Sequence, residues 1–322
     1  MTHDTVTLNS LPLRGNDKTV SGSDRRGKYS LKKEHFMTDK LKTRPTFTTS
    51  LFRSRNAVIG LVIVGIFLFC AAFASLITTH DPYEINLTLK EMAPSFHHPF
   101  GTDSLGRDVY ARVMFGTRIS LKVGVIAMSI SLLIGTIFGA LAGYFGGKLD
   151  TLIMRVTDIF LALPAAILAL AVMAIFENPS INKIFFVLGF IGWTTIARLV
   201  RSRVMEIKNE EYVLASVALG FGWMRTLFRH VLPNSMAPII VAATIGIAGN
   251  ILTEAWLSFL GLGAEPHIPS WGRMITEGQS YLALASKPWI YVAPGVALFL
   301  TVIGFNLLGD GLRDVLDPTL KE

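Results

Sequence analysis

The chain has 322 residues, of which 51% are hydrophobic and only 16% are charged, whereas a soluble globular domain carries about a quarter charged residues. Its mean hydropathy of +0.49 and its repeated apolar runs, long enough to cross a bilayer, exclude a soluble globular protein. They predict an all-α, polytopic membrane protein. The single cysteine, Cys70, lies inside an apolar run, which excludes an internal disulfide and a thiolate metal cluster.

The formal net charge of +7 is concentrated at the N-terminus, where residues 1–55 contain 12 Lys and Arg against 5 Asp and Glu. Because this excess flanks a membrane span, the positive-inside rule accounts for it and no nucleic-acid partner is predicted. Residues 1–45 are rich in Ser, Thr, Lys and Arg without a hydrophobic period. They are interpreted as a mostly disordered cytoplasmic tail, and Met37 is an alternative start.

Residues 46–117 are predicted to form an N-terminal region that includes the first transmembrane helix. Residues 46–55 are basic and aromatic, which suits a helix at the inner membrane face, and 56–77 are long enough to span the bilayer. Ala72-Phe73-Ala74 imitates a signal-peptidase site, but the apolar run continues past it, so cleavage is not expected.

Residues 80–117 are predicted to be a polar segment outside the membrane. It contains four side chains of types that can bind metals, but their spacing matches no tight motif, so turn formers and caps are expected and no metal is predicted. These residues are His97, His98, Asp103 and Asp108.

Residues 118–312 are predicted to form the main transmembrane domain, followed by a cytoplasmic tail at 313–322. Gly135, Gly139 and Gly143 recur every four residues, which predicts close packing of the second span against another helix. Leu163-Pro164 should kink the third span. The five further spans are expected at 118–145, 150–176, 182–204, 235–262 and 289–308, with a second outer segment at 263–288.

Three ionisable residues fall inside predicted spans. Arg155 and Asp158 are three residues apart, so they are expected to pair on one helix face near the cytoplasmic end. Glu254 is expected near the outer face. For all three a structural partner is the favoured interpretation, and contact with substrate is the alternative.

Residues 209–234 are too charged to cross a membrane and too apolar for an ordinary solvated loop. Asn209 is expected to cap a first short helix, which Gly220 and Gly222 end. A second short helix should run from Trp223 to Val231 and stop at Pro233. Exposed apolar surface of this size usually marks a docking site, and the small residues Ala215, Ser216 and Ala218 should let another protein approach closely.

Ala215-Ser216, Gly220 and Leu232-Pro233 at this spacing resemble the EAA signature of ABC-importer permeases. Tyr-Val-x-Ala, Arg-His-x-Leu-Pro-Asn and the block at 98–112 resemble the dipeptide/oligopeptide/nickel branch and its C-type subunit. Leu214 stands where the signature has Glu and His230 where Ile is usual, departures that the branch tolerates. The resemblance implies that 205–233 is the ATPase-coupling loop, with Glu211, Tyr212, Ala215, Ser216, Gly220, Arg229, His230, Leu232 and Pro233 as its site residues.

The resemblance also implies the fold and the partners. The fold would be that of a type I ABC importer, MetI-like, with six transmembrane helices. The chain would form half of a translocation pathway for di- or oligopeptides, with nickel complexes or glutathione as alternative substrates. Its partners would be a homologous permease subunit in a heterodimer, two cytoplasmic ATPase subunits and an extracytoplasmic substrate-binding protein. It would lie in the bacterial inner membrane with both termini in the cytoplasm.

The sequence contains no phosphate loop, no HExxH motif and no nucleophile elbow. No enzymatic activity and no cofactor are therefore predicted. The competing classes are a membrane enzyme, which needs a buried catalytic dyad, and an ion-driven carrier, which shows an internal repeat with intramembrane ion ligands. Neither feature is found in the sequence.

Overall fold

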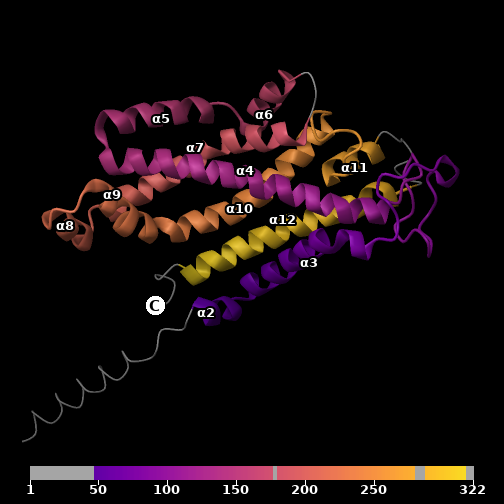
Figure 1. Ribbon diagram of the computed structural model, residues 1–322, viewed down its shortest axis with the longest axis horizontal. Helices are drawn as coiled ribbons and strands as arrows, with labels where there is room; N and C mark the ends of the chain where they lie inside the picture. The colour runs from indigo at the N-terminus through magenta and orange to yellow at the C-terminus, as the bar shows by residue number, and fades with distance from the viewer. Residues whose placement is uncertain (1–46, 177–179, 280–286, 317–322) are drawn as a thin grey trace, which may run out of the picture. The chain divides into compact units, whose positions relative to one another are not determined.

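The computed structural model describes residues 47–176, 180–279 and 287–316. The predicted tail at 1–45, Met37 and the last six residues lie outside these ranges. The described ranges contain helices and no strand (Figure 1). The helices are α2 (Phe47–Arg53), α3 (Arg55–Ile77), η1 (Leu87–Leu89), α4 (Val109–Phe145), α5 (Gly147–Leu161), α6 (Ala165–Ala174), α7 (Ile181–Ile207), α8 (Glu211–Ala218), α9 (Trp223–Thr226), the π segment η2 (Leu227–Val231), α10 (Leu232–Phe259), α11 (Trp271–Gln279) and α12 (Trp289–Leu316).

Five of these helical stretches are long and apolar enough to cross a membrane, and the α5–α6 pair makes a sixth if it counts as one span. The prediction of six spans is thus confirmed, with the third one broken. The axes of α5 and α6 differ by 82° at Leu163-Pro164, where the kink was predicted. Pro164 has ψ of 127°, an extended conformation that interrupts the helix, and its ring cannot donate a helical hydrogen bond.

Three predicted boundaries are wrong. α12 continues to Leu316, eight residues past the predicted end of the sixth span at 308. α4 begins at Val109, nine residues before the predicted start, because Asp108 is its N-cap and accepts a hydrogen bond from the Ala111 N–H at 2.6 Å. Pro233 does not end a helix, since α9, η2 and α10 form one continuous span from Trp223 to Phe259. Pro233 lies in the first turn of α10, where a missing N–H is tolerated.

The predicted close packing by glycines is confirmed between α4 and α7. A Cβ atom on Gly139 would lie 2.4 Å from the carbonyl oxygen of Ala197, and one on Gly135 would lie 2.6 Å from Cβ of Ile196. Gly189 of α7 faces Ile130 of α4 in the same way, at 2.6 Å. The glycine-rich face of α4 is therefore buried against α7, where a Cβ atom at these positions would collide with atoms of the facing helix.

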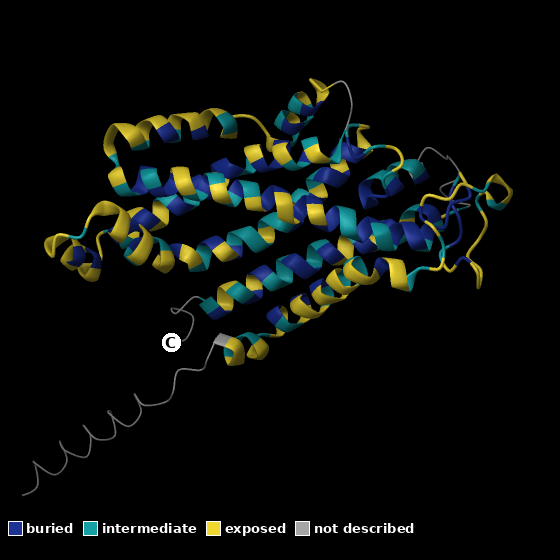
Figure 2. Ribbon diagram, in the orientation of Figure 1, coloured by how far each residue is buried: buried dark blue, intermediate teal, exposed yellow. Residues whose placement is uncertain are grey.

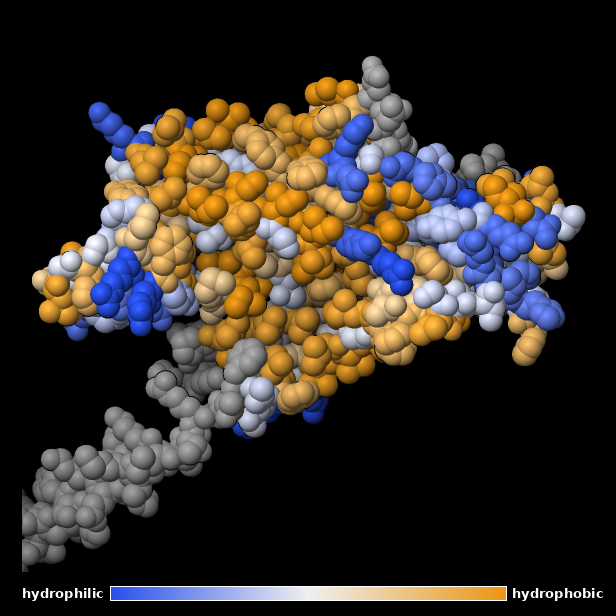
Figure 3. Space-filling view, viewed as in Figure 1, coloured by the Kyte–Doolittle hydropathy of each residue, from blue (hydrophilic) through white to orange (hydrophobic). Residues whose placement is uncertain are grey.

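α3 and α12 also pack closely at glycines (Figure 1). Cβ atoms on Gly60 and Gly311 would each lie 2.4 Å from a backbone nitrogen of the other helix, those of Leu308 and Ala57. Exposed residues run along the outsides of the spans in Figure 2, and the corresponding surface in Figure 3 is mainly hydrophobic. Surface of that kind suits lipid or another membrane subunit.

Candidate coupling loop and the buried polar clusters

The chain between α7 and α10 folds into two short helices, α8 and α9, that project from one end of the helices (Figure 1). α8 ends in a Schellman turn: the Phe221 N–H donates to the Ser216 carbonyl at 3.2 Å, and the Gly220 N–H donates to the Val217 carbonyl at 2.9 Å. Gly220 has φ of +82°, a conformation that favours glycine. Gly222, with φ of −64°, needs no such freedom.

One side of the loop packs on the transmembrane helices. Val213, Leu227 and Val231 are buried in a cluster with Val200 and Val204 of α7. These contacts fix the orientation of α8 and α9 with respect to the spans. The buried Ser216 belongs to this side too, because its hydroxyl donates to the Val213 carbonyl at 2.6 Å. The expectation that Ser216 faces a partner protein is therefore wrong, whereas Ala215 and Ala218 are exposed.

The opposite side of the loop is exposed and apolar. We call it the α8–α9 surface. Large side chains make up most of it, and Leu219 is 75% exposed and Phe228 63% exposed. Burial raises the pKa of the Tyr212 hydroxyl and the nearby Glu210 carboxylate adds to the rise, so this phenol stays neutral. The members of the surface are Tyr212, Leu214, Val217, Leu219, Trp223, Met224 and Phe228.

A stack of three side chains stiffens the turn between the two helices. The guanidinium of Arg225 lies 4.1 Å from the centre of the Phe221 ring, and the ring of His230 is parallel to Phe221 at 6.2 Å. Arg229 is exposed beside them. Cation–π contacts of this kind contribute about 0.5–1 kcal/mol at exposed sites. The stack thus holds two basic groups next to the α8–α9 surface.

The start of α8 differs from the prediction. Asn209 does not cap α8, because its Nδ2 donates to the Met205 carbonyl at 2.9 Å and so closes the last turn of α7. The N-cap is Glu210, whose side chain makes no capping bond. Glu211 begins α8 as an exposed residue, and Leu232 and Pro233 belong to the start of α10.

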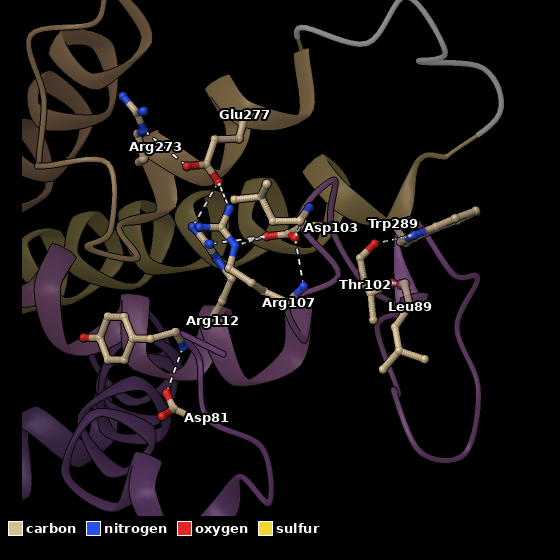
Figure 4. Close-up of polar contacts among 11 residues, drawn as sticks. Asp81, Leu89, Thr102, Asp103, Arg107, Arg112, Arg273, Glu277 and Trp289 are labelled. Carbon is tan, nitrogen blue, oxygen red and sulfur yellow. Dashed lines mark hydrogen bonds and ion pairs between the residues drawn. The ribbon is translucent and has the colours of Figure 1, made fainter. Parts of the chain in front are cut away.

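At the other end of the spans, a cluster of ion pairs joins the segment 78–108 to α4 and α11 (Figure 4). Arg107 donates through Nε to Asp103 at 2.7 Å and through Nη2 to Glu277 at 2.8 Å. Arg112, which is 1% exposed, lies with Nη2 3.0 Å from Glu277 and Nη1 3.3 Å from Asp103. Arg273 contacts Glu277 from the same helix at 3.3 Å.

Burial raises the pKa of the Glu277 carboxyl group, and the charges of Arg107 and Arg273 oppose that rise. Two carboxylates and three guanidinium groups thus neutralise most of one another's charge in a largely buried place. Sequence reasoning missed this cluster, since Glu277 follows Arg112 by 165 residues and no short motif joins them. Removing one charged group from a buried cluster of this kind destabilises the fold, because an opposite charge is then left buried without its partner.

The ionisable residues predicted inside the spans have different partners from those expected. Asp158 accepts from Arg198 of α7 at 2.8 Å, not from Arg155, which is exposed. The expected Arg155–Asp158 pair is therefore wrong, because the packing of α5 against α7 brings Arg198 to Asp158. Glu254 is fully buried and its Oε1 accepts from Ser258 at 2.7 Å. Ser258 lies one turn further along the same helix, so this partner of Glu254 is local.

The four side chains singled out between 97 and 108 fall into three different surroundings in the fold. Asp103 belongs to the ion-pair cluster, and His97 is exposed. His98 and Asp108 are brought together, with His98 Nδ1 2.7 Å from Asp108 Oδ2, and His80 lies beside them. His80 had not been singled out from the sequence.

Comparison with known proteins identifies the family. Residues 135–322 match the family of binding-protein-dependent transport system inner membrane components, and residues 47–94 match the N-terminal transmembrane domain of oligopeptide transport permease C. A solved structure of the MetNI methionine ABC transporter, in an inward-facing conformation, has a chain that is similar with a TM-score of 0.54 and 20% identity, over 64% of this chain and 96% of that one. That likeness shows the MetI-like permease fold.

Several curated proteins are similar over most of their length. The dipeptide transport system permease protein DppC of Alkalihalophilus pseudofirmus is 42% identical over 84% of this chain and 88% of its own. OppC, the oligopeptide transport system permease protein of Bacillus subtilis, is 41% identical over 84% and 88%. The glutathione transport system permease protein GsiD of Pectobacterium atrosepticum is 45% identical over 71% and 75%. The chain therefore belongs to the family of binding-protein-dependent transport system inner membrane components, a family of multi-pass ABC transport permeases, and to its C-type branch.

Proposed function

We propose that this chain is the C-type permease subunit of an ATP-driven importer, that it forms half of the translocation pathway for di- and oligopeptides, and that the α8–α9 surface contacts an ATPase subunit. The substrate class is supported by relatives that are named dipeptide and oligopeptide permeases and are 42% and 41% identical over 84% of the chain.

The observation that carries the proposal is the exposed apolar α8–α9 surface. Leu214, Val217 and Leu219 are more than half exposed on a helix whose other side is fixed by buried Val213. Burying such side chains contributes roughly 25 cal/mol for each Å² of apolar area. An exposed apolar surface on the loop between two spans fits a binding site for a soluble protein.

The remaining partners follow from the energetics of transport. A permease without a nucleotide site needs ATPase subunits to supply energy, so we propose that two of them bind, one through this loop and one through a homologous permease subunit. Rigid-body movement of the loops then switches the pathway between its two sides. An external binding protein would deliver the substrate at the other end of the spans. The loop and both termini are then cytoplasmic.

Glutathione is the second candidate substrate, because GsiD is 45% identical to this chain. Glutathione is itself a small peptide, so the same pathway suits either substrate class. Uptake of labelled di- and oligopeptides and of labelled glutathione, by cells that express the complete transporter, distinguishes the two. Peptide uptake that unlabelled glutathione does not reduce supports the proposal, and uptake of glutathione alone favours the second candidate.

The docking part of the proposal has its own test. Ala215 is exposed at the edge of the α8–α9 surface, so Ala215→Glu is expected to leave the permease folded while placing a charge against the ATPase. The matched control is Ala215→Ser, which is small and uncharged. Retention of the ATPase on purification with Ala215→Ser but not with Ala215→Glu supports the contact. Equal retention with both variants contradicts it.

A further inference from the structure

Two histidines and an aspartate converge where α3 ends and α4 begins. His98 Nδ1 is 2.7 Å from Asp108 Oδ2, and His80 Nδ1 is 4.0 Å from the same oxygen. The two imidazole rings lie 4.7 Å apart between centroids. One nitrogen or oxygen ligand atom from each residue lies within 4.8 Å of the others.

The backbone around Asp108 and His98 is held in place by hydrogen bonds, and His80 lies close to the end of α3. Asp108 is the N-cap of α4, with Oδ1 bound to the Ala111 N–H at 2.6 Å, and it is 3% exposed. His98 lies in a tight turn, since its N–H donates to Ser95 Oγ at 3.2 Å and its carbonyl accepts from the Gly101 N–H at 2.8 Å. His80 follows the end of α3 by three residues. Asp108 and His98 are therefore presented by hydrogen-bonded backbone, whereas His80 is partly exposed and its Nδ1 also lies 3.2 Å from Thr79 Oγ1.

We propose that His80, His98 and Asp108 form a binding site for a divalent transition-metal cation, with zinc as the best fit. Imidazole nitrogen and carboxylate oxygen are zinc's common ligands, and imidazole disfavours magnesium and calcium. With zinc–ligand bonds of about 2.0–2.1 Å, tetrahedral ligand atoms lie roughly 3.3 Å apart. Changes of roughly 0.6–0.7 Å would bring the two measured distances to that value, which is within the reach of side-chain rotation.

The site has an entrance and an open position. The His80 side chain is 37% exposed, whereas those of His98 and Asp108 are 11% and 3% exposed. A cation can thus reach the buried pair from the His80 side, and three protein ligands leave a fourth position for water. The bound cation would link the end of α3, the turn at 95–101 and the first turn of α4. It would hold the segment 78–108 against the spans.

The proposal is tested with the full chain in lipid nanodiscs, stripped by a chelator and titrated with Zn²⁺ against a competing chelator. We expect one zinc ion per chain and no competition from excess Mg²⁺. His80→Ala and Asp108→Asn should each weaken zinc binding by at least about tenfold, a loss that mutations beside a metal site already cause. The matched control, His97→Ala, removes the adjacent exposed histidine and should bind zinc as the wild type does.

Melting temperatures measured without zinc separate a lost ligand from a damaged fold. Asp108→Asn keeps a side-chain oxygen for the Ala111 N–H and His80 is partly exposed, so both variants should melt within a few degrees of the wild type. Zinc should then raise the melting temperature of the wild type and of His97→Ala only. Undiminished zinc affinity in His80→Ala, loss of zinc binding in His97→Ala, or no zinc bound by the wild type would each overturn the proposal.

Discussion

The N–H of Phe221 donates to the carbonyl of Ser216 across a turn in which Gly220 has φ of +82°. This bond fixes the direction in which the chain leaves α8, and so it fixes the position of α9 relative to the exposed side of α8. A Cβ atom on Gly220 would meet no other atom within 4 Å. Any cost of replacing Gly220 therefore comes from the backbone conformation and not from a clash.

Gly220→Val is expected to lose substrate uptake and ATPase association while the transmembrane helices fold and insert normally. A β-branched residue at positive φ costs roughly 1–2 kcal/mol, enough to favour a rearranged turn in an exposed loop. The matched control is Gly222→Val, because Gly222 is also unobstructed but has φ of −64°. Equal uptake by the two variants would show that the Schellman turn is not needed for coupling.

The proposed orientation predicts which ends of the spans are accessible from outside the cell. In a Cys70→Ser background, Phe96→Cys should react with a membrane-impermeant thiol reagent in intact spheroplasts and Leu219→Cys should not. Both positions are exposed, at 98% and 75%, so burial does not explain a difference between them. Both variants should react once the membrane is permeabilised. Labelling of Leu219→Cys in intact spheroplasts would contradict the orientation.

The close packing of α4 against α7 predicts that adding a single methyl group there lowers the stability of the protein. Gly139→Ala would place Cβ 2.4 Å from the Ala197 carbonyl oxygen, and backbone atoms cannot move aside cheaply. We expect a loss of roughly 1–3 kcal/mol in unfolding free energy, measured by thermal denaturation in detergent. Gly65→Ala in α3 is the control, since its Cβ would meet nothing within 4 Å. Equal stability of the two variants would mean that the helices are not packed this closely.

Removal of Glu277 should destabilise the contact between α11 and the start of α4. Glu277→Ala leaves Arg107 and Arg112 buried beside Asp103, the acidic partner that they still share among the described residues. Breaking a buried pair in this way costs about 3–5 kcal/mol. The control is Glu206→Ala, which removes an exposed partner of Arg203 and should cost less than about 1 kcal/mol. Comparable melting temperatures for both variants would rule out a stabilising role for the cluster.

The spans could be predicted from the sequence because their signal is local. The structure confirms the apolar spans, the close packing predicted from the glycine period of α4, and the kink at Leu163-Pro164. Each of these depends on residues within a few turns of one helix. Predictions of helix ends were wrong where the hydrogen bond of a single side chain determines the end. Asp108 starts α4 early by capping it, and Asn209 bonds backward to Met205 instead of forward.

The loop and the polar clusters were only partly predictable. Gly220 and the exposed apolar residues follow from composition and turn chemistry, but the buried side of α8, with Ser216, is set by contact with α7. Asp158 binds Arg198, 40 residues away, and the short spacing from Arg155 gave the wrong partner. His80 lies beside His98 and Asp108 because the end of α3 packs near the start of α4. Sequence spacing alone does not predict that contact.

The most direct measurement of the central claim is site-specific crosslinking from the α8–α9 surface in membranes that contain the complete transporter. In a Cys70→Ser background, a thiol-directed photocrosslinker on Leu214→Cys should capture the ATPase subunit, because Leu214 is 54% exposed on that surface. The same reagent on Phe96→Cys, at the far end of the spans, should not capture it. If Leu214→Cys captures only lipid or another membrane subunit, the loop is not the ATPase contact.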